Sequence, residues 1–214
     1  MSVFSRRVRY VVVACAIVSS ACTSSVETGP VESSAVAFDD LVISARASSN
    51  GVSALVDAHL EARSLARPVN LKSDDAIFVE DGTGRRELAP LEGGAALVFP
   101  STAQRFDVVL VRGSSENRVP VELPSPFVLA APAKASRTEG FTVTFEADAR
   151  VPTTFLVGRA GASKLALTAK AGVGEITVNG ADLAGKGPFK VEVRAQRVAN
   201  GGSQVRTVEV EIVP

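Results

Sequence analysis

The sequence predicts an all-β protein: two small antiparallel β-sandwich domains that follow a signal peptide and a flexible tether. Three observations carry this prediction. Apolar and polar residues alternate with period two through most of the chain after Phe38. Turn signals recur at short intervals. The long amphipathic helices that a parallel sheet needs are not seen in the pattern. A chain of 214 residues has room for one or two domains rather than several.

The first 21 residues have the layout of an export signal. Arg6, Arg7 and Arg9 form a positive front, an apolar run follows over Tyr10–Val18, and small residues end the segment at Ser19–Ala21. A helix needs about 20 residues to cross the hydrocarbon core of a bilayer, and this run is much shorter. We therefore expect residues 1–21 to be a signal peptide rather than a permanent span.

The small residues lead into Cys22, and Ser19-Ser20-Ala21-Cys22 resembles the lipobox of bacterial lipoproteins. In that family the cysteine sulfur receives a diacylglyceryl group, and cleavage leaves the modified cysteine as the first residue. The family favours Leu or Val where Ser19 stands. The letters before Cys15 fit better, but Cys15 follows the arginines too closely for export. The alternative is ordinary cleavage after Ala21, which gives a soluble secreted protein with a free thiol.

The resemblance implies a membrane anchor and a cellular location. A diacylglyceryl group supplies two acyl chains, and two membrane signals are what stable anchoring requires. Thr23 stands where some lipoproteins carry a retention Asp, which by resemblance points to the outer membrane. We expect a bacterial cell-envelope protein, lipid-anchored and facing the periplasm or the cell exterior. Residues 22–36 are small, polar and acidic, and we expect the lipidated N-terminus to continue into a flexible linker.

The first domain is predicted over residues 37–124. Alternation predicts a strand over Leu41–Ala47, and Asn50-Gly51 predicts a hairpin turn because both residues tolerate positive φ. Residues 52–62 alternate again, with Leu55 as the one apolar exception on the polar face. The alanine content leaves a helix open as the alternative there. Further strands are expected at 76–80, 95–99, 105–112 and 118–123, with breaks at Asp81-Gly82, Gly93-Gly94 and Pro100.

The second domain is predicted over residues 125–214. It follows a stiff joint in which prolines flank Ser125, and its clearest strand alternates from Phe141 to Phe145. Further strands are expected after the joint at Phe127–Leu129 and at 155–157, 165–167, 176–178, 189–195 and 205–213, which makes seven short strands in all.

A second resemblance concerns this domain. Leu183–Val191 resembles the approach to the penultimate strand of immunoglobulin-like domains, although Phe189 stands where Tyr is usual and the chain lacks Trp and paired Cys. The proline joint, Pro132, and Ser136-Arg137 ahead of the Phe/Val strand resemble uncharacterised bacterial envelope lipoproteins built from two small β domains. That resemblance implies no known activity.

Composition excludes several classes of function. The 23 basic and 23 acidic residues balance, which gives no electrostatic drive toward nucleic acid. Both cysteines lie within the first 22 residues, so the remainder has no disulfide, no cysteine-zinc site and no thiol catalysis. There is no Trp, which weakens any sugar-stacking site. No small-molecule cofactor is expected.

The remaining polar patterns favour structural explanations. His59 lies between Asp57 and Glu61 on one strand face, which could hold a cation but is typical of a solvated face. Acidic residues near glycine could bind calcium, but their spacing matches no calcium loop and turns use the same residues. They are Asp39-Asp40, Asp74-Asp75 and Glu80-Asp81-Gly82.

No catalytic or metal site is predicted. Ser101-Thr102 and Ser114-Ser115 have no neighbouring His in sequence to act as a base, and Gly82–Arg85 fits a turn better than a phosphate loop. The sequence therefore favours a non-enzymatic, membrane-anchored envelope protein, structural or binding another envelope protein, with exposed sheet edges suited to strand addition. The alternative is a hydrolase or a calcium-dependent module that uses loop carboxylates.

Overall fold

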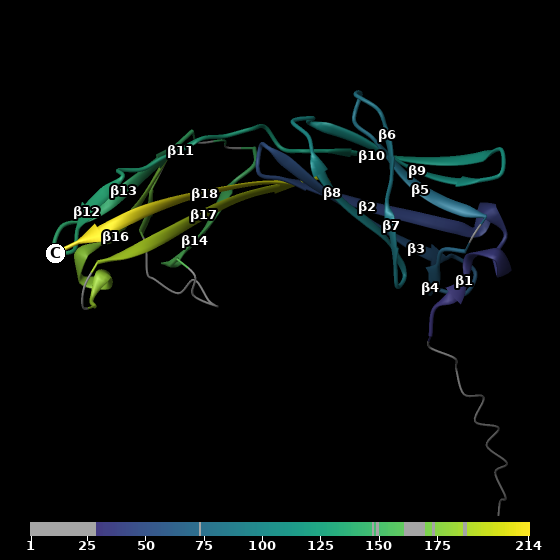
Figure 1. The fold of residues 1–214 in the computed structure, drawn as a ribbon, viewed down its shortest axis with the longest axis horizontal. Coiled ribbons are helices and arrows are strands. Elements are labelled where there is room, and N and C mark those ends of the chain that lie inside the picture. The colour runs from purple at the N-terminus through teal and green to yellow at the C-terminus, as the bar shows by residue number, and fades with distance from the viewer. Residues whose placement is uncertain are drawn as a thin grey trace, which may run out of the picture.

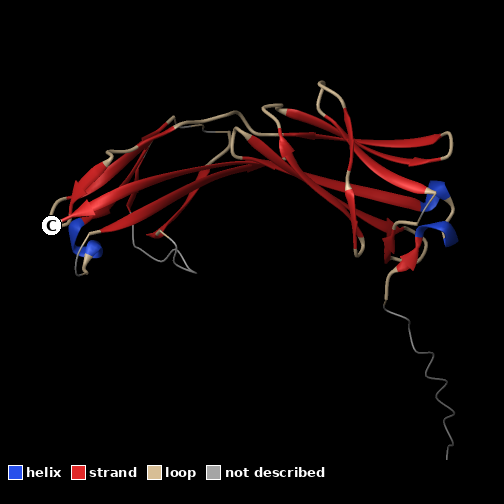
Figure 2. Cartoon of the chain, viewed as in Figure 1, coloured by secondary structure: helices blue, strands red, loops and turns tan. Residues whose placement is uncertain are grey.

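The computed structural model describes residues 29–214 except 73, 147, 149, 161–169, 173 and 186–187. Its regular elements are strands and three short 3-10 helices, η1 (Ser33–Ala35), η2 (Phe38–Asp40) and η3 (Gly180–Leu183). Two lobes lie end to end and form a bent, elongated molecule (Figure 1). Strands make up almost all of both lobes (Figure 2), which confirms the predicted all-β class.

The first lobe is a sandwich of two sheets. One sheet has the order β2-β3-β8-β7, and the short strands β4 and β1 continue it beside the end of β3. The other has the order β10-β9-β5-β6. The strands are β1 (Val31–Glu32), β2 (Leu41–Ser49), β3 (Ser53–Ala62), β4 (Arg67–Asn70), β5 (Asp75–Glu80), β6 (Arg85–Glu87), β7 (Ala89–Leu91), β8 (Gly94–Pro100), β9 (Arg105–Arg112) and β10 (Ser115–Glu122).

The β2–β3 hairpin forms where the turn signal predicts it. Asn50 Oδ1 accepts hydrogen bonds from the backbone N–H of Val52 and of Ser53, both at 2.9 Å, and Gly51 has a φ of +92°. Ser53–Ala62 is a strand, so the helix alternative for this segment is wrong. Buried and less buried side chains alternate along it, as in a strand with one face on a core.

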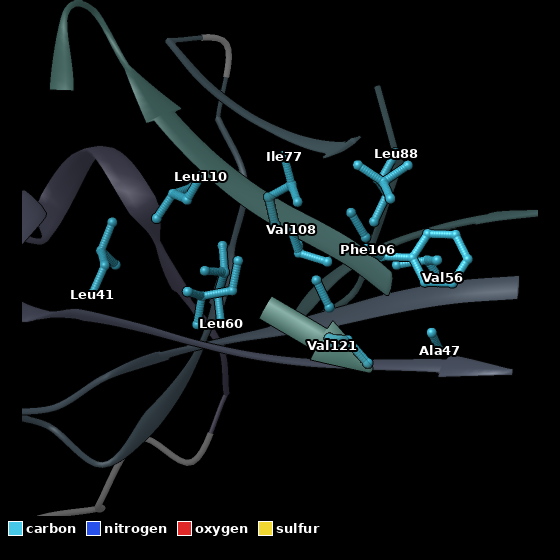
Figure 3. Close-up of a cluster of buried hydrophobic side chains, with 14 of the residues drawn as sticks. Leu41, Ala47, Val56, Leu60, Ile77, Leu88, Phe106, Val108, Leu110 and Val121 are labelled. Atoms are coloured by element: carbon cyan, nitrogen blue, oxygen red, sulfur yellow. The ribbon is translucent and has the colours of Figure 1, made fainter. Parts of the chain in front are cut away.

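The core of the first lobe lies between its two sheets (Figure 3). Val56 and Leu60 from β3 face Ile77 from β5 and Val108 and Leu110 from β9, and all five are at most 2% exposed. Fully burying an aliphatic side chain of this size stabilises the fold by about 1.5–3 kcal/mol. This layer is what holds the two sheets together.

The expected linker over residues 22–36 ends earlier than the sequence predicted. Val31–Glu32 pairs in parallel with β4, and Val36 is 6% exposed in the core. Ser33 is fully buried, and its Oγ accepts a hydrogen bond from the backbone N–H of Lys72 at 2.9 Å. The composition of small polar residues predicted a flexible segment. Residues 31–36 are instead fixed in the first lobe by the pairing of β1 with β4 and by the hydrogen bond to the buried Ser33 hydroxyl.

The second lobe is also a sandwich. One sheet has the order β11-β13-β16-β15, and the other contains β14, β17 and β18, with β12 parallel to the end of β18. The last two strands are long rather than short, and the strand predicted at 165–167 lies outside the described residues. The strands are β11 (Leu129–Ala130), β12 (Lys134–Ser136), β13 (Gly140–Phe145), β14 (Thr153–Arg159), β15 (Lys170–Gly172), β16 (Glu175–Asn179), β17 (Phe189–Ala199) and β18 (Gly202–Val213).

Both lobes share one topology. Apart from the short strands β1, β4, β6 and β12, each lobe has seven strands. One sheet contains β2, β3, β8 and β7 in the first lobe and β11, β13, β16 and β15 in the second. The other sheet contains β5, β9 and β10 in the first lobe and β14, β17 and β18 in the second. In chain order, the first, second, fifth and fourth strands thus form one sheet, and the third, sixth and seventh form the other. This is the strand order of the immunoglobulin-like sandwich. Each lobe has its own buried cluster, one built from residues between 36 and 123 and the other from residues between 127 and 212.

A shared sheet joins the lobes, and the sequence did not predict it. Gly202–Gln204 at the start of β18 pairs in parallel with Ala47–Ser49 at the end of β2. One ten-stranded sheet therefore runs from the first lobe into the second. The fully buried Gln204 donates from Nε2 to Oε1 of Gln104 in the first lobe at 3.0 Å.

Two further features close this joint. Gly202 packs so tightly that a Cβ there would lie 2.0 Å from the carbonyl oxygen of Glu122, so only glycine fits without backbone movement. Arg206 donates from Nε to the Phe127 carbonyl at 3.1 Å and from Nη1 to the Ser49 carbonyl at 3.4 Å. Burial lowers the pKa of this guanidinium below its usual value. The joint is thus bonded through main chain and side chains together.

Candidate functional site

A charged cleft of about 550 Å³ lies in the first lobe. It lies beside the turn between β5 and β6 and is open to solvent. Both acidic and basic side chains line it. Such a cleft could bind a ligand or carry a reaction only if some of these side chains are not already paired with one another. The lining residues are Glu80, Asp81, Gly82, Gly84, Arg85, Arg105 and Asp107.

Asp81 is fully engaged in local bonds. It accepts hydrogen bonds from Thr83 Oγ1 at 2.6 Å and from Ser101 Oγ at 2.9 Å, and Arg86 Nη1 lies 3.0 Å from its Oδ1. Burial alone would raise the pKa of Asp81, but the bonds from Thr83, Ser101 and Arg86 outweigh it and hold the pKa well below its usual range. A carboxylate held ionised in this way cannot donate a proton near neutral pH, and it serves as a turn anchor.

Glu80 and Arg85 belong to an ion-pair ladder on the outer face of the same sheet. Arg118 contacts Glu80 at 2.7 Å and Glu116 at 2.8 Å, while Arg85 contacts Glu116 at 3.0 Å. The hydrogen bonds that Arg118 donates to Glu80 and Glu116 raise the pKa of its guanidinium. Arg85 also stacks over the Phe78 ring at 4.3 Å. Arg85 of the ladder therefore covers the Phe78 ring, so these charged side chains contribute to packing.

In the acidic pair Asp74-Asp75, the second carboxylate likewise has a structural role. Asp75 makes a bidentate pair with Arg112, at 2.6 Å to Nε and 2.7 Å to Nη2. The Arg112 hydrogen bond lowers the pKa of Asp75 against the opposing effect of burial. Arg112 also donates to the carbonyls of Ser33 and Val36, both at 2.7 Å, so this pair fastens the N-terminal segment to β9.

The other sequence candidates do not converge. His59 lies on the exposed face of β3, 62% exposed, with Nε2 3.3 Å from Asp57 Oδ2. Asp40 accepts bonds from the backbone N–H and hydroxyl of Ser64, as a turn residue does. Within the described part of the chain, no three His, Cys, Asp or Glu side chains are grouped to hold a metal ion. Cys22 lies outside the described residues.

The free edge of β10 has features that hinder pairing with another strand. This strand ends the order of its sheet, and Pro120 within it supplies no backbone N–H. Glu116, Arg118 and Glu122 alternate with less polar residues along it. Proline and charge are the usual devices that prevent edge-to-edge pairing, so this edge is poorly suited to the strand addition expected from the sequence.

The shared sheet instead exposes apolar side chains on its outer face. Registers place Val198, Ser203, Ser48, Leu55 and Val98 in one row across β17, β18, β2, β3 and β8. In this row Val198 is 60% exposed, Leu55 40% and Val98 66%. The sequence signal was the single apolar residue on the polar face of β3. The row itself depends on the joint, which the sequence did not reveal.

A second row beside the first is also uncharged. Thr154, Gln196 and Val205 lie in register across β14, β17 and β18, and Ser53 and Pro100 lie in register across β3 and β8. We call the two rows together the uncharged face. Its ten residues are Ser48, Ser53, Leu55, Val98, Pro100, Thr154, Gln196, Val198, Ser203 and Val205.

Comparisons with known proteins add only distant likenesses. No protein-family model and no curated protein matches the sequence. A chimeric titin Z1Z2 structure is 14% identical, covering 81% of this chain and 97% of that one, with a TM-score of 0.27. The BSP domain of a biofilm-associated protein is 10% identical over 81% and 30%, with a TM-score of 0.29. A Salmonella α-2-macroglobulin mutant is 14% identical over 82% and 15%, with a TM-score of 0.29.

These scores are too low to carry an argument, so the fold assignment stands on the strand order. The described residues contain no helix long and apolar enough to span a membrane. The class of protein that fold and surface define is a two-lobed immunoglobulin-like sandwich with an exposed uncharged face.

Proposed function

We propose that this protein is a lipid-anchored envelope protein that binds a protein partner and has no catalytic activity of its own. The observation that carries the proposal is the row containing Leu55, Val98 and Val198, which leaves large apolar side chains uncovered in the middle of a sheet. Leu55 and Val98 are neighbours in register, and Val198 lies in the same row beyond Ser48 and Ser203. An exposed surface that is mostly apolar often marks a binding site. Two of the three acids in the charged cleft, Glu80 and Asp81, are bonded to neighbouring side chains, which disfavours a catalytic role for them. The third, Asp107, has its Oδ1 3.7 Å from Arg105 Nη2.

Partner binding is tested by a photo-crosslinking residue at position 198 in intact cells, with position 128 as the matched control. Val128 is 75% exposed and lies outside the uncharged face. We expect a discrete crosslinked protein from position 198 and none from position 128. Equal crosslinking at both positions, or no crosslink at either, would contradict a dedicated binding face.

The anchor part of the proposal is supported by Ser19-Ser20-Ala21-Cys22. It is tested by metabolic labelling with a fatty-acid probe. Cys22→Ala should abolish the label and release the protein from membranes. Cys15→Ala should keep both the label and the membrane association. Full labelling of Cys22→Ala, or an unlabelled wild-type protein in the culture fluid, would remove the anchor from the proposal.

The hydrolase or calcium alternative is tested on the same purified protein. Because the cleft carboxylates already have partners, we expect calorimetric titration with calcium to be flat. An ester and glycan substrate screen should show no turnover. Saturable calcium binding that disappears in Asp107→Asn would revive the alternative.

A further inference from the structure

The uncharged face has the composition of an interface core. About a fifth of the chain's residues are charged, yet none of these ten is. Interface cores are depleted in charge and surrounded by a polar rim. Here the rim is present on both sides along the strands. Arg46 and Asp57 pair in register toward the first lobe, and Arg194 contacts Glu192 at 2.8 Å toward the second.

The size of the face limits what can cover it. The face crosses six strands. A strand spacing of about 4.8 Å and a two-residue repeat of about 6.8 Å therefore make it roughly 24 Å by 14 Å, on the order of 300 Å². A stable interface between two proteins of this size needs about 800 Å² from each partner. A second copy of the chain therefore finds too little area here, unless surfaces of a different character contribute most of the contact.

The shape of the molecule further limits what can bind to the uncharged face. Figure 1 shows the shared sheet, with β14, β17, β18, β2 and β3, along the inner side of the bend between the lobes. Two copies that met through this side would touch at their tips before their centres met. A slender rod laid across the bend would reach the row directly. An α-helix is about 10–12 Å wide with its side chains, and about 16 residues of it span 24 Å, so a helix fits both dimensions of the face.

From this match we infer that the uncharged face binds one amphipathic α-helix of a partner protein, laid across the bend with its apolar stripe on Val198, Leu55 and Val98. The inference rests on the proposed function and names its partner class. Serine hydroxyls at positions 48 and 203 form the floor between the larger side chains, so apolar residues of the helix have room there. A helix docked by an apolar stripe is a recurrent mode of peptide recognition.

The site is composite, and this has a consequence. Val198 comes from the second lobe, whereas Leu55 and Val98 come from the first, and only the β2–β18 pairing puts them in one row. Binding therefore depends on the joint as well as on the contact residues. A variant that loosens the joint, such as Gly202→Ala, should weaken binding although position 202 is buried and makes no contact with the helix.

The test uses the full-length mature chain and two labelled 16-residue peptides of identical composition. One has leucines at i, i+3, i+4 and i+7 on an Ala/Glu/Lys background, and the other has the same residues scrambled so that no stripe forms. Fluorescence anisotropy should show binding of the striped peptide at least tenfold tighter than that of the scrambled one. Leu55→Ser and Val198→Ser should each weaken it about tenfold, which corresponds to roughly 1.4 kcal/mol.

Leu65→Ser and Val128→Ser are the matched controls, since both residues are exposed apolar residues outside the face. Their affinities should stay within twofold of wild type. Equal binding of the two peptides, or equal losses in face and control variants, would overturn the inference. So would concentration-dependent dimers that Val198→Ser abolishes, because a second copy would then be the occupant. Adsorption to lipid vesicles through the same residues would overturn it as well.

Failure of the inference can be told apart from failure of the proposed function. If position 198 crosslinks a protein in cells while the striped peptide does not bind, the face binds a partner that is not a helix. If no protein is crosslinked at position 198 and the striped peptide does not bind, the inference and the proposed binding function are both wrong.

Discussion

The two lobes have the same strand order but satisfy their buried polar groups in opposite ways. In the first lobe Arg112 is neutralised by Asp75, whose side chain is 1% exposed. In the second lobe Arg197 is 2% exposed and, among the described residues, has no carboxylate partner. It donates to Thr153 Oγ1 at 3.0 Å and to the Glu146 carbonyl, and it stacks over the Phe127 ring at 4.4 Å.

The difference teaches that a topology fixes strand positions but not how buried charge is compensated. An ion pair makes the first lobe depend on ionised carboxylates. Carbonyl and hydroxyl acceptors together with an aromatic face compensate the buried Arg197 of the second lobe without an ionised carboxylate. The four predictions that follow test this contrast, from the largest expected effect to the smallest.

Arg112→Leu should give the largest loss. It leaves the Asp75 carboxylate buried without its partner and frees the Ser33 and Val36 carbonyls, so the first lobe should lose about 3–5 kcal/mol of unfolding free energy. Urea unfolding followed by circular dichroism measures the loss, and hydrogen exchange assigns it to a lobe. Arg118→Leu is the control, because its ion pairs are exposed and it should leave the midpoint unchanged. Equal losses in both variants would contradict the contrast.

Gly202→Ala should come second, at about 2 kcal/mol, because its Cβ must displace the Glu122 carbonyl. It acts on the joint rather than on either core. Calorimetry should therefore show the two lobes unfolding further apart in temperature than in wild type. Gly84→Ala, with nothing within 4 Å of its Cβ, is the control. An unchanged thermogram for Gly202→Ala would mean that the joint does not couple the lobes.

Phe127→Leu should cost the second lobe about 1–2 kcal/mol. The substitution keeps an apolar side chain but removes the ring on which Arg197 stacks, and Arg206 lies 5.8 Å from the same ring. Phe106 of the first lobe is fully buried, and no cation–π contact to its ring is seen among the described residues, so Phe106→Leu should cost less. If the two losses are equal, the stacked guanidinium contributes nothing beyond burial.

Lowering the pH should give the smallest effect and affect one lobe only. The folded-state pKa values of Asp75 and Asp81 lie below their unfolded value of 3.8, so both stabilise the fold above about pH 4. That stability is lost as the pH falls through 4 toward the folded pKa values. Hydrogen exchange at pH 3 should show the first lobe opening before the second. Asp75→Asn should reduce the pH dependence, and an acid transition common to both lobes would contradict the assignment.

Much of the fold follows from local pattern. Strands such as β3 and β13 show the alternation that one buried face imposes, and the Asn50-Gly51 turn needs residues that accept positive φ. Short strands such as β1 and β7 were not predicted, because two or three residues show no period and pairing partners decide them.

The candidate site was predictable only in part. Leu55 stood out in the sequence only as the one apolar residue on the polar face of its strand, and the structure leaves it 40% exposed. The row to which it belongs requires β2 to pair with β18, and these strands are far apart in sequence. No local property of Ser48 or Ser203 specifies that pairing; it depends on glycine at position 202 and on the bonds of Arg206.

The direction of the strands has a mechanical consequence. The described chain begins at the outer tip of the first lobe, and its C-terminus lies at the outer tip of the second (Figure 1). Because β2 runs toward the joint and β18 runs away from it in parallel, tension between the tips loads the Ala47–Ser49 and Gly202–Gln204 pairing in shear. Hydrogen bonds pulled in shear share the force and yield together instead of opening one after another. With the anchor proposed at Cys22, this pairing suits the protein to transmit a steady pull along its length.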